Sequence, residues 1–349
     1  MNVAAPQAER LPRVRQLGWR IGQYENALLV ALVIALGVAF TLATPSGTFL
    51  SGTNFKNIAL DTSEILVLSA GMTFVIIAAG LDLSIGSVVV FSSVCAAELM
   101  TQVAGTASNA LATPQNLGLA IAVGVVVAIA SGAVWGGVNG YITAYRGVPA
   151  FVVTLGTLGI ALGFAQVITG GLNVPGVPVQ LQTSLGSGEA FGVIPWLVVV
   201  AAVVVGVLWV VLAQTRYGLR TYAIGANAEA ARRAGVNVRR HTASLYVLMG
   251  VLAGVVGFMD LARFDTASIA AHTQDNLSAI AAVVIGGTSL FGGKGRMSGT
   301  IIGAFIPAIL RNGFILMDVQ PFWQNVAVGT VLIIAVYIDQ VRRRRQLLV

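Results

Sequence analysis

Residues 193–214 of the chain have the sequence VIPWLVVVAAVVVGVLWVVLAQ, without one charged side chain. A helix needs about 20 mainly apolar residues to cross the roughly 30 Å hydrocarbon layer of a bilayer. The stretch ends directly before a loop, residues 215–241, that contains six arginines. It therefore predicts a helix that crosses a membrane and ends at a basic surface.

Stretches of the same kind recur along the whole chain. Only 9% of its 349 residues are charged while 56% are hydrophobic, whereas a soluble domain carries about 25% charged residues. So few charges cannot coat a surface in water, and lipid is the solvent that the apolar excess requires. We expect an all-α integral membrane protein of about ten transmembrane helices. Besides 193–214, the expected spans lie near residues 26–44, 63–80, 84–101, 117–142, 149–169, 242–262, 276–292, 297–315 and 322–340.

The basic residues test this count. If the chain begins in the cytoplasm and the helices alternate, the inner segments are residues 1–25, 81–83, 143–148, 215–241, 293–296 and 341–349. Of the 20 lysines and arginines, all but Lys56, Arg263 and Arg311 fall in these segments, as the positive-inside rule requires. We therefore expect both termini in the cytoplasm, a cytoplasmic segment 1–25, a transmembrane domain 26–340 with a cytoplasmic loop 215–241, and a basic tail 341–349. The net charge of +7 is spread over these loops instead of one patch, so nucleic-acid binding is not expected.

Glycines at four-residue spacing mark several expected helices. Such faces let helix backbones approach closely in lipid, where no hydrophobic drive holds helices together. Packing within one subunit is the expected role, with a dimer seam or a translocation surface as alternatives. The candidates for packing or for such a surface are Gly132, Gly136, Gly140, Thr154, Gly156, Gly159 and Gly163.

No catalytic or metal-binding constellation is present in the sequence. His241 and His272 lie far apart and on opposite predicted sides, and the single cysteine, Cys95, offers neither a disulfide nor a metal-binding pattern. A nucleotide-binding P-loop around Lys294 would need glycine at position 288 and a hydroxyl residue at position 295, and neither is there. We expect no enzyme active site, no metal site and no ATP site in this chain.

Charged residues inside or beside apolar runs are functional candidates in lipid. Asp82 begins an expected helix beside a cytoplasmic turn and is followed by Ser84 and Gly86. A carboxylate there can cap exposed N–H groups and complement the helix dipole. We expect a helix cap or, as the alternative, a gating or subunit-contact role. Asp260 and Arg263 lie three residues apart on one helix, so a local ion pair is expected.

The basic loop 215–241 contains the pattern of one short helix. Asn227 suits the N-cap, Glu229 the first turn, Arg232 the last turn and Gly235 the stop. One face is small and nearly featureless because alanines such as Ala231 occupy it. A two-turn helix is not stable alone in water, so packing must support it. It could fit a partner's groove or lie on anionic lipid headgroups, and spacing alone leaves both open.

At this loop the sequence resembles a known family. Residues 222–238, YAIGANAEAARRAGVNV, resemble the coupling segment of ribose- and xylose-type ABC transporter permeases. Four further stretches resemble the same family in the same order: GLDLSIGS (80–87), VPAFVVTLG (148–156), AIAAVVIGGTSL (279–290) and PFWQ (321–324). Together with the span pattern, the resemblance covers nearly the whole chain, although each piece alone is a weak apolar or glycine-rich match.

The resemblance implies a multi-pass permease subunit of a bacterial inner-membrane importer that works by alternating access. It implies three partners: a second permease subunit, identical or not, a cytoplasmic ABC ATPase that binds ATP and Mg²⁺, and a periplasmic binding protein that delivers a sugar. The chain itself is then not an enzyme and binds no cofactor. The coupling contact with the ATPase would fall on Gly225, Asn227, Glu229, Ala230, Ala231, Arg232 and Gly235.

One position departs from the family pattern. Ser278 stands where the family commonly has an acidic residue before the AIAA string, so an outer-side contact with the binding protein or the sugar is expected to differ. The alternative function is a secondary transporter driven by an ion gradient. It predicts titratable groups near the middle of the membrane, and the sequence places almost none there. The sequence does not determine the sugar, because the separate binding protein can set that choice.

Overall fold

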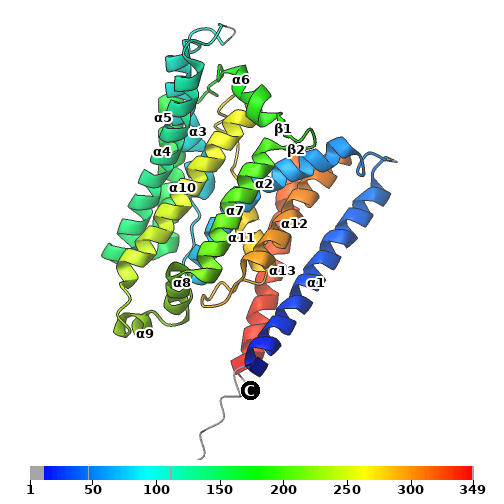
Figure 1. The fold of residues 1–349 in the computed structure, drawn as a ribbon, viewed down its shortest axis with the longest axis vertical. Helices are drawn as coiled ribbons and strands as arrows, with labels where there is room; N and C mark the ends of the chain where they lie inside the picture. The colour runs from blue at the N-terminus through cyan, green and yellow to red at the C-terminus, as the bar shows by residue number, and fades with distance from the viewer. Residues whose placement is uncertain (1–11, 46, 111, 348–349) are drawn as a thin grey trace, which may run out of the picture.

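The computed structural model describes residues 12–45, 47–110 and 112–347, and they form an almost entirely helical bundle (Figure 1). A short β-hairpin pairs β1 (Glu189–Ala190) with β2 (Ile194–Pro195) in antiparallel fashion at one end. A π-helical turn, η1 (Gln182–Gly186), precedes it. The α-helices are α1 (Pro12–Ala43), α2 (Gly52–Ile77), α3 (Ile85–Ala104), α4 (Leu117–Arg146), α5 (Ala150–Thr169), α6 (Val179–Leu181), α7 (Trp196–Gln214), α8 (Arg216–Ala226), α9 (Ala228–Arg233), α10 (Val238–Phe264), α11 (Asp275–Ile285), α12 (Met297–Leu316) and α13 (Pro321–Leu347).

Within the described residues, eight helices are long and apolar enough to cross a membrane: α1, α2, α3, α4, α5, α7, α10 and α12. The expected count of ten is therefore not confirmed. The window 276–292 forms only the 11-residue α11, which at about 1.5 Å per residue covers roughly half of the hydrocarbon layer. Helix α13 is long, but its apolar part is Phe322–Ile334. Of the predicted terminal segments, residues 1–11 and 348–349 lie outside the described residues.

The closest packing between two helices of the bundle joins α4 to α10, with α3 against both (Figure 1). At Gly132, Gly136 and Gly140 of α4, an added Cβ would lie 2.2–2.6 Å from a carbonyl oxygen of α10. From the opposite side, a Cβ on Gly250 or Gly254 would lie 2.1 or 2.2 Å from a carbonyl oxygen of α4. Only glycine permits such a close approach of two backbones, so this part of the glycine pattern packs helices within the subunit.

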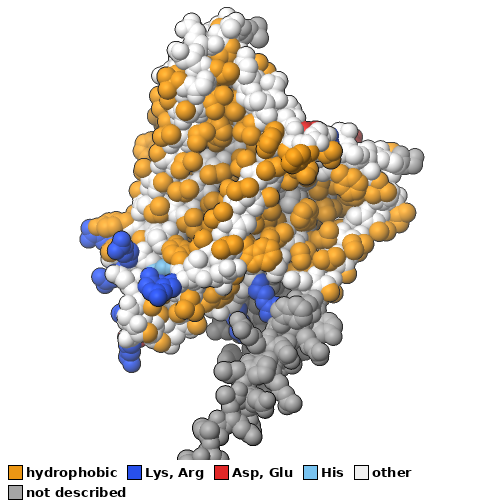
Figure 2. All heavy atoms as spheres, in the orientation of Figure 1, with side chains coloured by type: hydrophobic (Ala, Val, Ile, Leu, Met, Phe, Trp, Pro, Cys, Tyr) orange, Lys and Arg blue, Asp and Glu red, His pale blue; other side chains and the backbone are white. Residues whose placement is uncertain are grey.

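The wall of the bundle is apolar and its two ends differ in charge. Figure 2 shows hydrophobic side chains over most of the visible wall and blue lysine and arginine side chains gathered at the lower end, where Figure 1 places α8 and α9. Large side chains stand fully outward on several helices, including Leu42 at 82% exposure and Val167 at 77%. Such a surface suits lipid, because water would disfavour so large a continuous apolar area.

A break in the helical structure, residues 78–84 between α2 and α3, lies inside the bundle. Ala79 has a positive φ of 61° that ends α2, and Asp82 is only 2% exposed. Asp82 borders a small interior gap together with Gly250, which lies near the middle of α10. The prediction that residues 81–83 form a turn at the cytoplasmic surface is therefore wrong.

Side chains from other helices satisfy the backbone of this break. The Tyr246 hydroxyl of α10 donates to the Leu81 carbonyl at 3.3 Å, and the Asn276 side-chain amide of α11 donates to the Leu83 carbonyl at 3.2 Å. Irregular backbone at membrane depth is tolerated only where protein or trapped water supplies such partners. The local sequence could not reveal this depth because the partners come from distant helices.

Candidate functional site

The short helix predicted in the basic loop is present as α9. The side-chain oxygen of Asn227 caps it by accepting from the Ala230 N–H at 2.9 Å. Glu229 lies in the first turn and pairs with Arg232 at 2.9 Å and Arg233 at 3.3 Å. All three charged side chains are more than half exposed. The helix and its N-cap are confirmed, while its docking role stays a prediction.

Helix α9 ends at a glycine, and its alanines are partly buried and partly exposed. Gly235 follows the helix with a φ of +85°, a conformation that glycine adopts without strain. Ala231 is only 5% exposed because it faces its own chain, whereas Ala230 is exposed. Ala231 is therefore covered by its own chain while Ala230 is accessible, and the place of both residues in the coupling contact stays a prediction.

An additional helix that the loop pattern did not predict, α8, carries α9. Thr215 caps α8 by accepting from the Tyr217 N–H at 3.1 Å. The Tyr222 hydroxyl donates to the Gly295 carbonyl at 2.9 Å. Thr221 bonds to His241 of α10 at 2.9 Å. These contacts fix α8 to the loop before α12 and to the beginning of α10, which supplies the support that the short α9 needs.

Gly225, near the end of α8, touches Ile77, the last residue of α2 before the helix break. A Cβ at this position would lie 1.7 Å from the Ile77 carbonyl oxygen and 2.6 Å from the Gly293 nitrogen. Those two groups are bonded to each other, since the Gly293 N–H donates to the Ile77 oxygen at 2.8 Å. Three backbone segments therefore meet at one point: the end of α8, the end of α2 and the loop 286–296.

Beyond this junction, four buried polar side chains form a chain of hydrogen bonds across three helices. Oδ1 of Asp82 accepts from the Ser84 N–H at 2.9 Å and from the Ser84 hydroxyl at 2.6 Å. The side-chain amide of Asn139 in α4 donates to the Ser84 hydroxyl at 2.9 Å. The Thr157 hydroxyl of α5 donates to Asn139 Oδ1 at 2.6 Å. The network thus ties the beginning of α3 to α4 and α5.

The contacts of Asp82 specify what a cap means here. Its carboxylate holds Ser84, the residue at the N-cap position of α3, and Ser84 itself makes no side-chain cap bond. The predicted neighbour Gly86 packs against the segment before α11, since an added Cβ would lie 2.2 Å from the His272 carbonyl oxygen. Whether the negative charge on Asp82 has a gating role stays a prediction.

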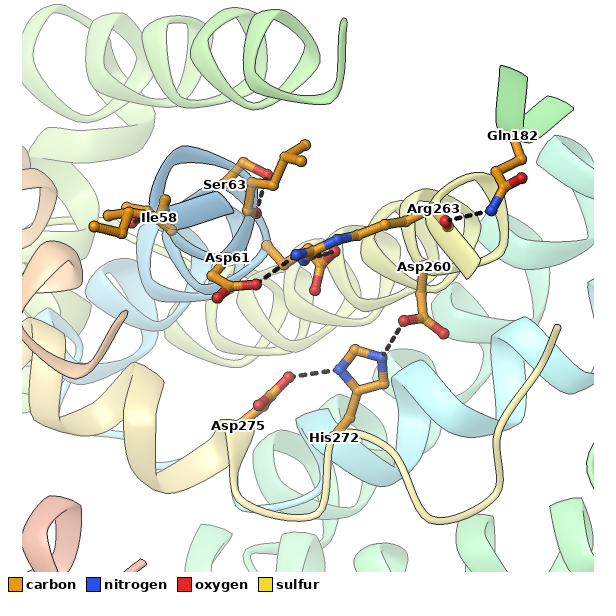
Figure 3. Close-up of polar contacts among 11 residues, drawn as sticks. Ile58, Asp61, Ser63, Gln182, Asp260, Arg263, His272 and Asp275 are labelled. Carbon is orange, nitrogen blue, oxygen red and sulfur yellow. Dashed lines mark hydrogen bonds and ion pairs between the residues drawn. The ribbon is translucent and has the colours of Figure 1, made fainter. Parts of the chain in front are cut away.

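A second polar cluster lies at the end of the bundle opposite α9 and was not predicted as a site. It lines a cavity of about 330 Å³ between α2, α10, α12, the segment 265–274 and the first residue of α11. Figure 3 shows Arg263 of α10 reaching Asp61 of α2, and His272 lying between Asp260 and Asp275. The described charged residues around the cavity are Asp61, Glu64, Asp260, Arg263, His272, Asp275 and Arg311.

The expected local pair between Asp260 and Arg263 does not form. Arg263 binds two carboxylates of α2, Asp61 at 2.6 Å and Glu64 at 3.2 Å. Asp260 instead lies 3.1 Å from Nε2 of His272. A guanidinium has five donors in a fixed fork and can hold two carboxylates at once, which one partner on its own helix would not achieve. Arg263 therefore joins α10 to α2.

His272 holds the segment 265–274 against the bundle. Its Nδ1 lies 2.6 Å from Asp275, its Nε2 lies 3.1 Å from Asp260, and its side chain is 6% exposed. Burial alone would lower the pKa of His272, but the carboxylates of Asp275 and Asp260 raise its pKa well above the usual 6.5. The imidazole is therefore protonated at neutral pH and acts as a cation between two carboxylates.

The remaining predicted residues lie on α5. Thr154 is buried and donates to the Ala150 carbonyl of its own helix at 2.9 Å. By contrast, a Cβ on Gly156, Gly159 or Gly163 would meet no described atom of the chain within 4 Å. These three glycines are unused by packing within the described part of the subunit, unlike those of α4. Whether they form a seam or a translocation surface stays a prediction.

Several residues of these clusters were not predicted from the sequence. Asn139 and Thr157 are single polar residues in apolar runs, a weak signal because such residues also occur as isolated helix-packing positions. Asp61 and Glu64 gave a stronger signal, since two acids one turn apart at the edge of an apolar run call for partners in lipid. Ser278, the departure from the family pattern, is buried in α11 one turn after Asp275, whose carboxylate reaches the cavity.

Comparisons with known proteins place the chain in one family. Residues 54–336 match the family described as branched-chain amino acid transport system / permease component. The ribose import permease protein RbsC of Escherichia coli K12 is 37% identical over 318 residues, which cover 90% of this chain and 93% of RbsC. The xylose transport system permease protein XylH of E. coli K12 is 30% identical, with 91% and 92% covered.

A third relative is the galactose/methyl galactoside import permease protein MglC of Haemophilus influenzae, 32% identical with 91% of this chain and 94% of MglC covered. No solved structure matches the chain significantly. The family match spans most of the chain, including the helix break 78–84 and the loop that carries α9. The chain is therefore a multi-pass inner-membrane protein and belongs to this family of transport-system permease components.

Proposed function

We propose that the chain is the membrane-spanning subunit of an ATP-driven sugar importer. Its similarity to permeases named for ribose, xylose and galactose supports a sugar as the solute. The observation that carries the proposal is α9, a capped two-turn helix exposed at the arginine-rich end and supported by α8. Such a helix offers a rigid projection that a partner's groove can hold, and it needs no further folding when the partner binds.

The arginine-rich end is proposed to face the cytoplasm, with both chain termini on that side. The loops at this end carry most of the lysines and arginines, in agreement with the positive-inside rule. In this topology residues 1–25 and 341–349 flank a transmembrane domain 26–340, and the loop 215–241 carries α8 and α9. The charged cavity then faces the periplasm.

Each proposed partner has one role. A cytoplasmic ABC ATPase would bind ATP and Mg²⁺, a periplasmic binding protein would deliver the sugar, and a second permease subunit would complete the pathway. The open glycines of α5, Gly156, Gly159 and Gly163, are the candidate surface for that subunit or for the pathway. Movement of α9 on the ATPase would reach the helix break through α8, because Gly225 touches the Ile77 carbonyl.

A tryptophan on the exposed face of α9 tests the coupling role. We expect Ala230→Trp to obstruct the ATPase groove while leaving the fold intact, because Ala230 is exposed and lies outside the bundle. Overpacking an interface by a large side chain costs about 1–3 kcal/mol, and 1.4 kcal/mol is a factor of about ten in affinity. The matched control is Ala213→Trp, which adds the same side chain to an exposed position near the end of α7.

The measurements are co-purification of the ATPase in detergent and sugar uptake by the complete complex in vesicles. We expect both to fall about tenfold in Ala230→Trp and to stay near wild type in Ala213→Trp. A helix that lies on lipid headgroups would instead tolerate an interfacial tryptophan. Full ATPase retention and full uptake in Ala230→Trp would show that α9 is not the coupling contact.

Family membership does not favour the alternative, a secondary transporter driven by an ion gradient. One feature that the sequence alone did not reveal would suit that alternative, since the carboxyl group of Asp82 is buried inside the bundle near Gly250 of α10. Uptake that requires ATP and is insensitive to proton and sodium ionophores separates the two functions.

A further inference from the structure

The charged cavity at the end opposite α9 has the size of a ligand site. Its volume of about 330 Å³ lies at the lower end of the roughly 300–1,000 Å³ that small-molecule pockets occupy. Its walls come from three membrane-crossing helices and the segment before α11, so the polar groups converge from separate elements. The ion pairs described above fix the side chains in place before any ligand arrives.

The carboxylates around the cavity keep unused hydrogen-bond acceptors. Asp61, Glu64, Asp260 and Asp275 each engage one carboxylate oxygen in the ion pairs of Arg263 and His272. The other oxygen of each has no hydrogen-bond or ion-pair partner among the described residues. Asp260 is only 3% exposed and Glu64 8%. Because these residues line the cavity, their second oxygens can accept hydrogen bonds from a ligand or water inside it.

Donors are present as well. Arg311 lines the cavity from α12, is exposed, and makes no ion pair within 4 Å among the described residues. The hydroxyls of Thr266 and Ser268 add groups that both donate and accept. A ligand that fits this set must offer several donors and several acceptors close together. Neighbouring hydroxyl groups do this, because each hydroxyl donates one hydrogen bond and accepts others.

The charges around the cavity nearly cancel, which disfavours an ion as its ligand. With His272 protonated, the three cations Arg263, His272 and Arg311 face four carboxylates, so the cavity is nearly neutral. No group of three or more His, Cys, Asp or Glu side chains in the described residues could hold a metal ion. A near-neutral site rich in donors and acceptors favours an uncharged polar molecule over a cation or an anion.

We propose that this cavity binds an uncharged, hydroxyl-rich solute of monosaccharide size within the permease itself. The inference rests on the proposed function only for the choice of sugar probes. Ala271 and His272 also border a smaller cavity of about 80 Å³, whose other walls include Leu83 and Gly86 at the beginning of α3. The segment with His272 therefore separates the solute site from the helix break, the next irregular region toward the opposite end.

Protection of a cysteine from labelling tests the site directly. In a Cys95→Ala background, Ser268→Cys places a thiol in the cavity wall, and Leu172→Cys places one on an exposed turn outside it. The full complex without binding protein, in nanodiscs, is labelled with an impermeant maleimide in the presence of D-ribose, D-xylose or D-galactose. At a sugar concentration about ten times the dissociation constant, labelling of Ser268→Cys should slow about tenfold, because the free fraction is about 1/(1 + [L]/Kd). Labelling of Leu172→Cys should not change.

Substitutions in the cavity separate binding from folding. Arg311→Gln removes a charged donor from an exposed position without breaking an ion pair in the described structure, so it should fold normally. The sugar concentration needed for protection should rise about tenfold or more, as for the loss of a charged hydrogen bond. The matched control is Asp265→Asn, a neighbouring charge change that does not line the cavity and whose positive φ of 49° suits asparagine. It should leave the protecting concentration unchanged.

Each outcome of these experiments supports or overturns the sugar site. Protection by a neutral sugar that Arg311→Gln weakens and Asp265→Asn preserves supports the site. Absence of protection by every sugar, while the same complex with its binding protein imports one of them, overturns the site and leaves the proposed function intact. Protection by the unliganded binding protein but not by free sugar also overturns it, because the cavity is then a protein-docking surface. A complex that imports none of these three sugars refutes ribose, xylose and galactose as its solutes, and sugar protection measured on that complex still decides the site.

Discussion

The close approach of α4 and α10 makes a quantitative prediction at Gly136. A Cβ at this position would lie 2.3 Å from the Tyr246 carbonyl oxygen and 2.9 Å from the Val247 Cα, whereas ordinary contacts of a Cβ begin near 3.4 Å. Gly136→Ala therefore forces the two helices apart by about 1 Å, and other backbone contacts along the seam weaken with it. Overpacking of this kind costs about 1–3 kcal/mol.

The next residue of α4 is an internal control. A Cβ on Gly137 would meet nothing within 4 Å, so Gly137→Ala adds the same methyl group without a clash. Each substitution gains about 0.5–1 kcal/mol of helix propensity, and this gain cancels between the two variants. The difference between them is therefore the cost of the clash alone. We expect Gly136→Ala to be less stable than Gly137→Ala by about 1–3 kcal/mol.

Unfolding by SDS in mixed micelles, followed by tryptophan fluorescence, measures this difference. Trp135 lies beside the seam on α4 and packs edge-on against Phe91 at a centroid distance of 5.7 Å, so it reports local separation. Sugar uptake by the assembled complex is the second measurement, and it should stay near wild type in Gly137→Ala. Equal stability of Gly136→Ala and Gly137→Ala would refute the reasoning, because the helices would then not be held together at the distance described.

Three further predictions concern the polar groups. Asp82→Asn keeps an oxygen that can accept both hydrogen bonds from Ser84, so the protein should remain folded. If sugar uptake collapses while the protein is present in the membrane at normal levels, the negative charge of Asp82 is needed for transport. Arg263→Gln leaves two α2 carboxylates without their partner and should lower the free energy of unfolding by about 3–5 kcal/mol. A free energy of unfolding equal to that of wild type would contradict this ion pair. The pKa of His272 is raised in the folded state, so its stabilising contribution is full below about pH 6.5 and is lost as the pH rises through the higher folded pKa. Stability measured against pH should show this decline in wild type and not in His272→Gln, and identical profiles would remove the charged role of the imidazole.

What the sequence predicted correctly was what local composition controls. The uncharged stretch 193–214 contains α7 (Trp196–Gln214), because lipid accepts a continuous apolar helix and little else. Helix α9 agreed with its pattern for a similar reason, since Asn227 and Gly235 act on backbone groups within a few residues of themselves. In both cases the determining partners are the solvent or near neighbours in the chain.

What the sequence did not predict depends on partners far along the chain. The apolar composition of the window 276–292 does not show whether one continuous helix fills it. Helix α11 ends after 11 residues, about half the length needed to span the membrane, and Gly287 follows with a φ of +87°. Asp82 was expected at the surface because a turn between two apolar runs usually lies there. Its neighbours Ser84 and Leu81 are instead bonded to α4 and α10, and Asp82 is buried with them. Arg263 had a neighbour of opposite charge on its own helix but binds α2, where two carboxylates outweigh one.

The meeting point of Gly225, Ile77 and Gly293 has a mechanical consequence. A usual contact between helices passes through side chains, whose rotamers can change and absorb a displacement of a few tenths of an ångström. Here main chain touches main chain, and the Ile77 carbonyl and the Gly293 N–H are already bonded to each other. No side chain between the segments can change its rotamer to absorb a displacement, so the junction resists compression. A displacement of α8 toward this point therefore moves the end of α2 with it.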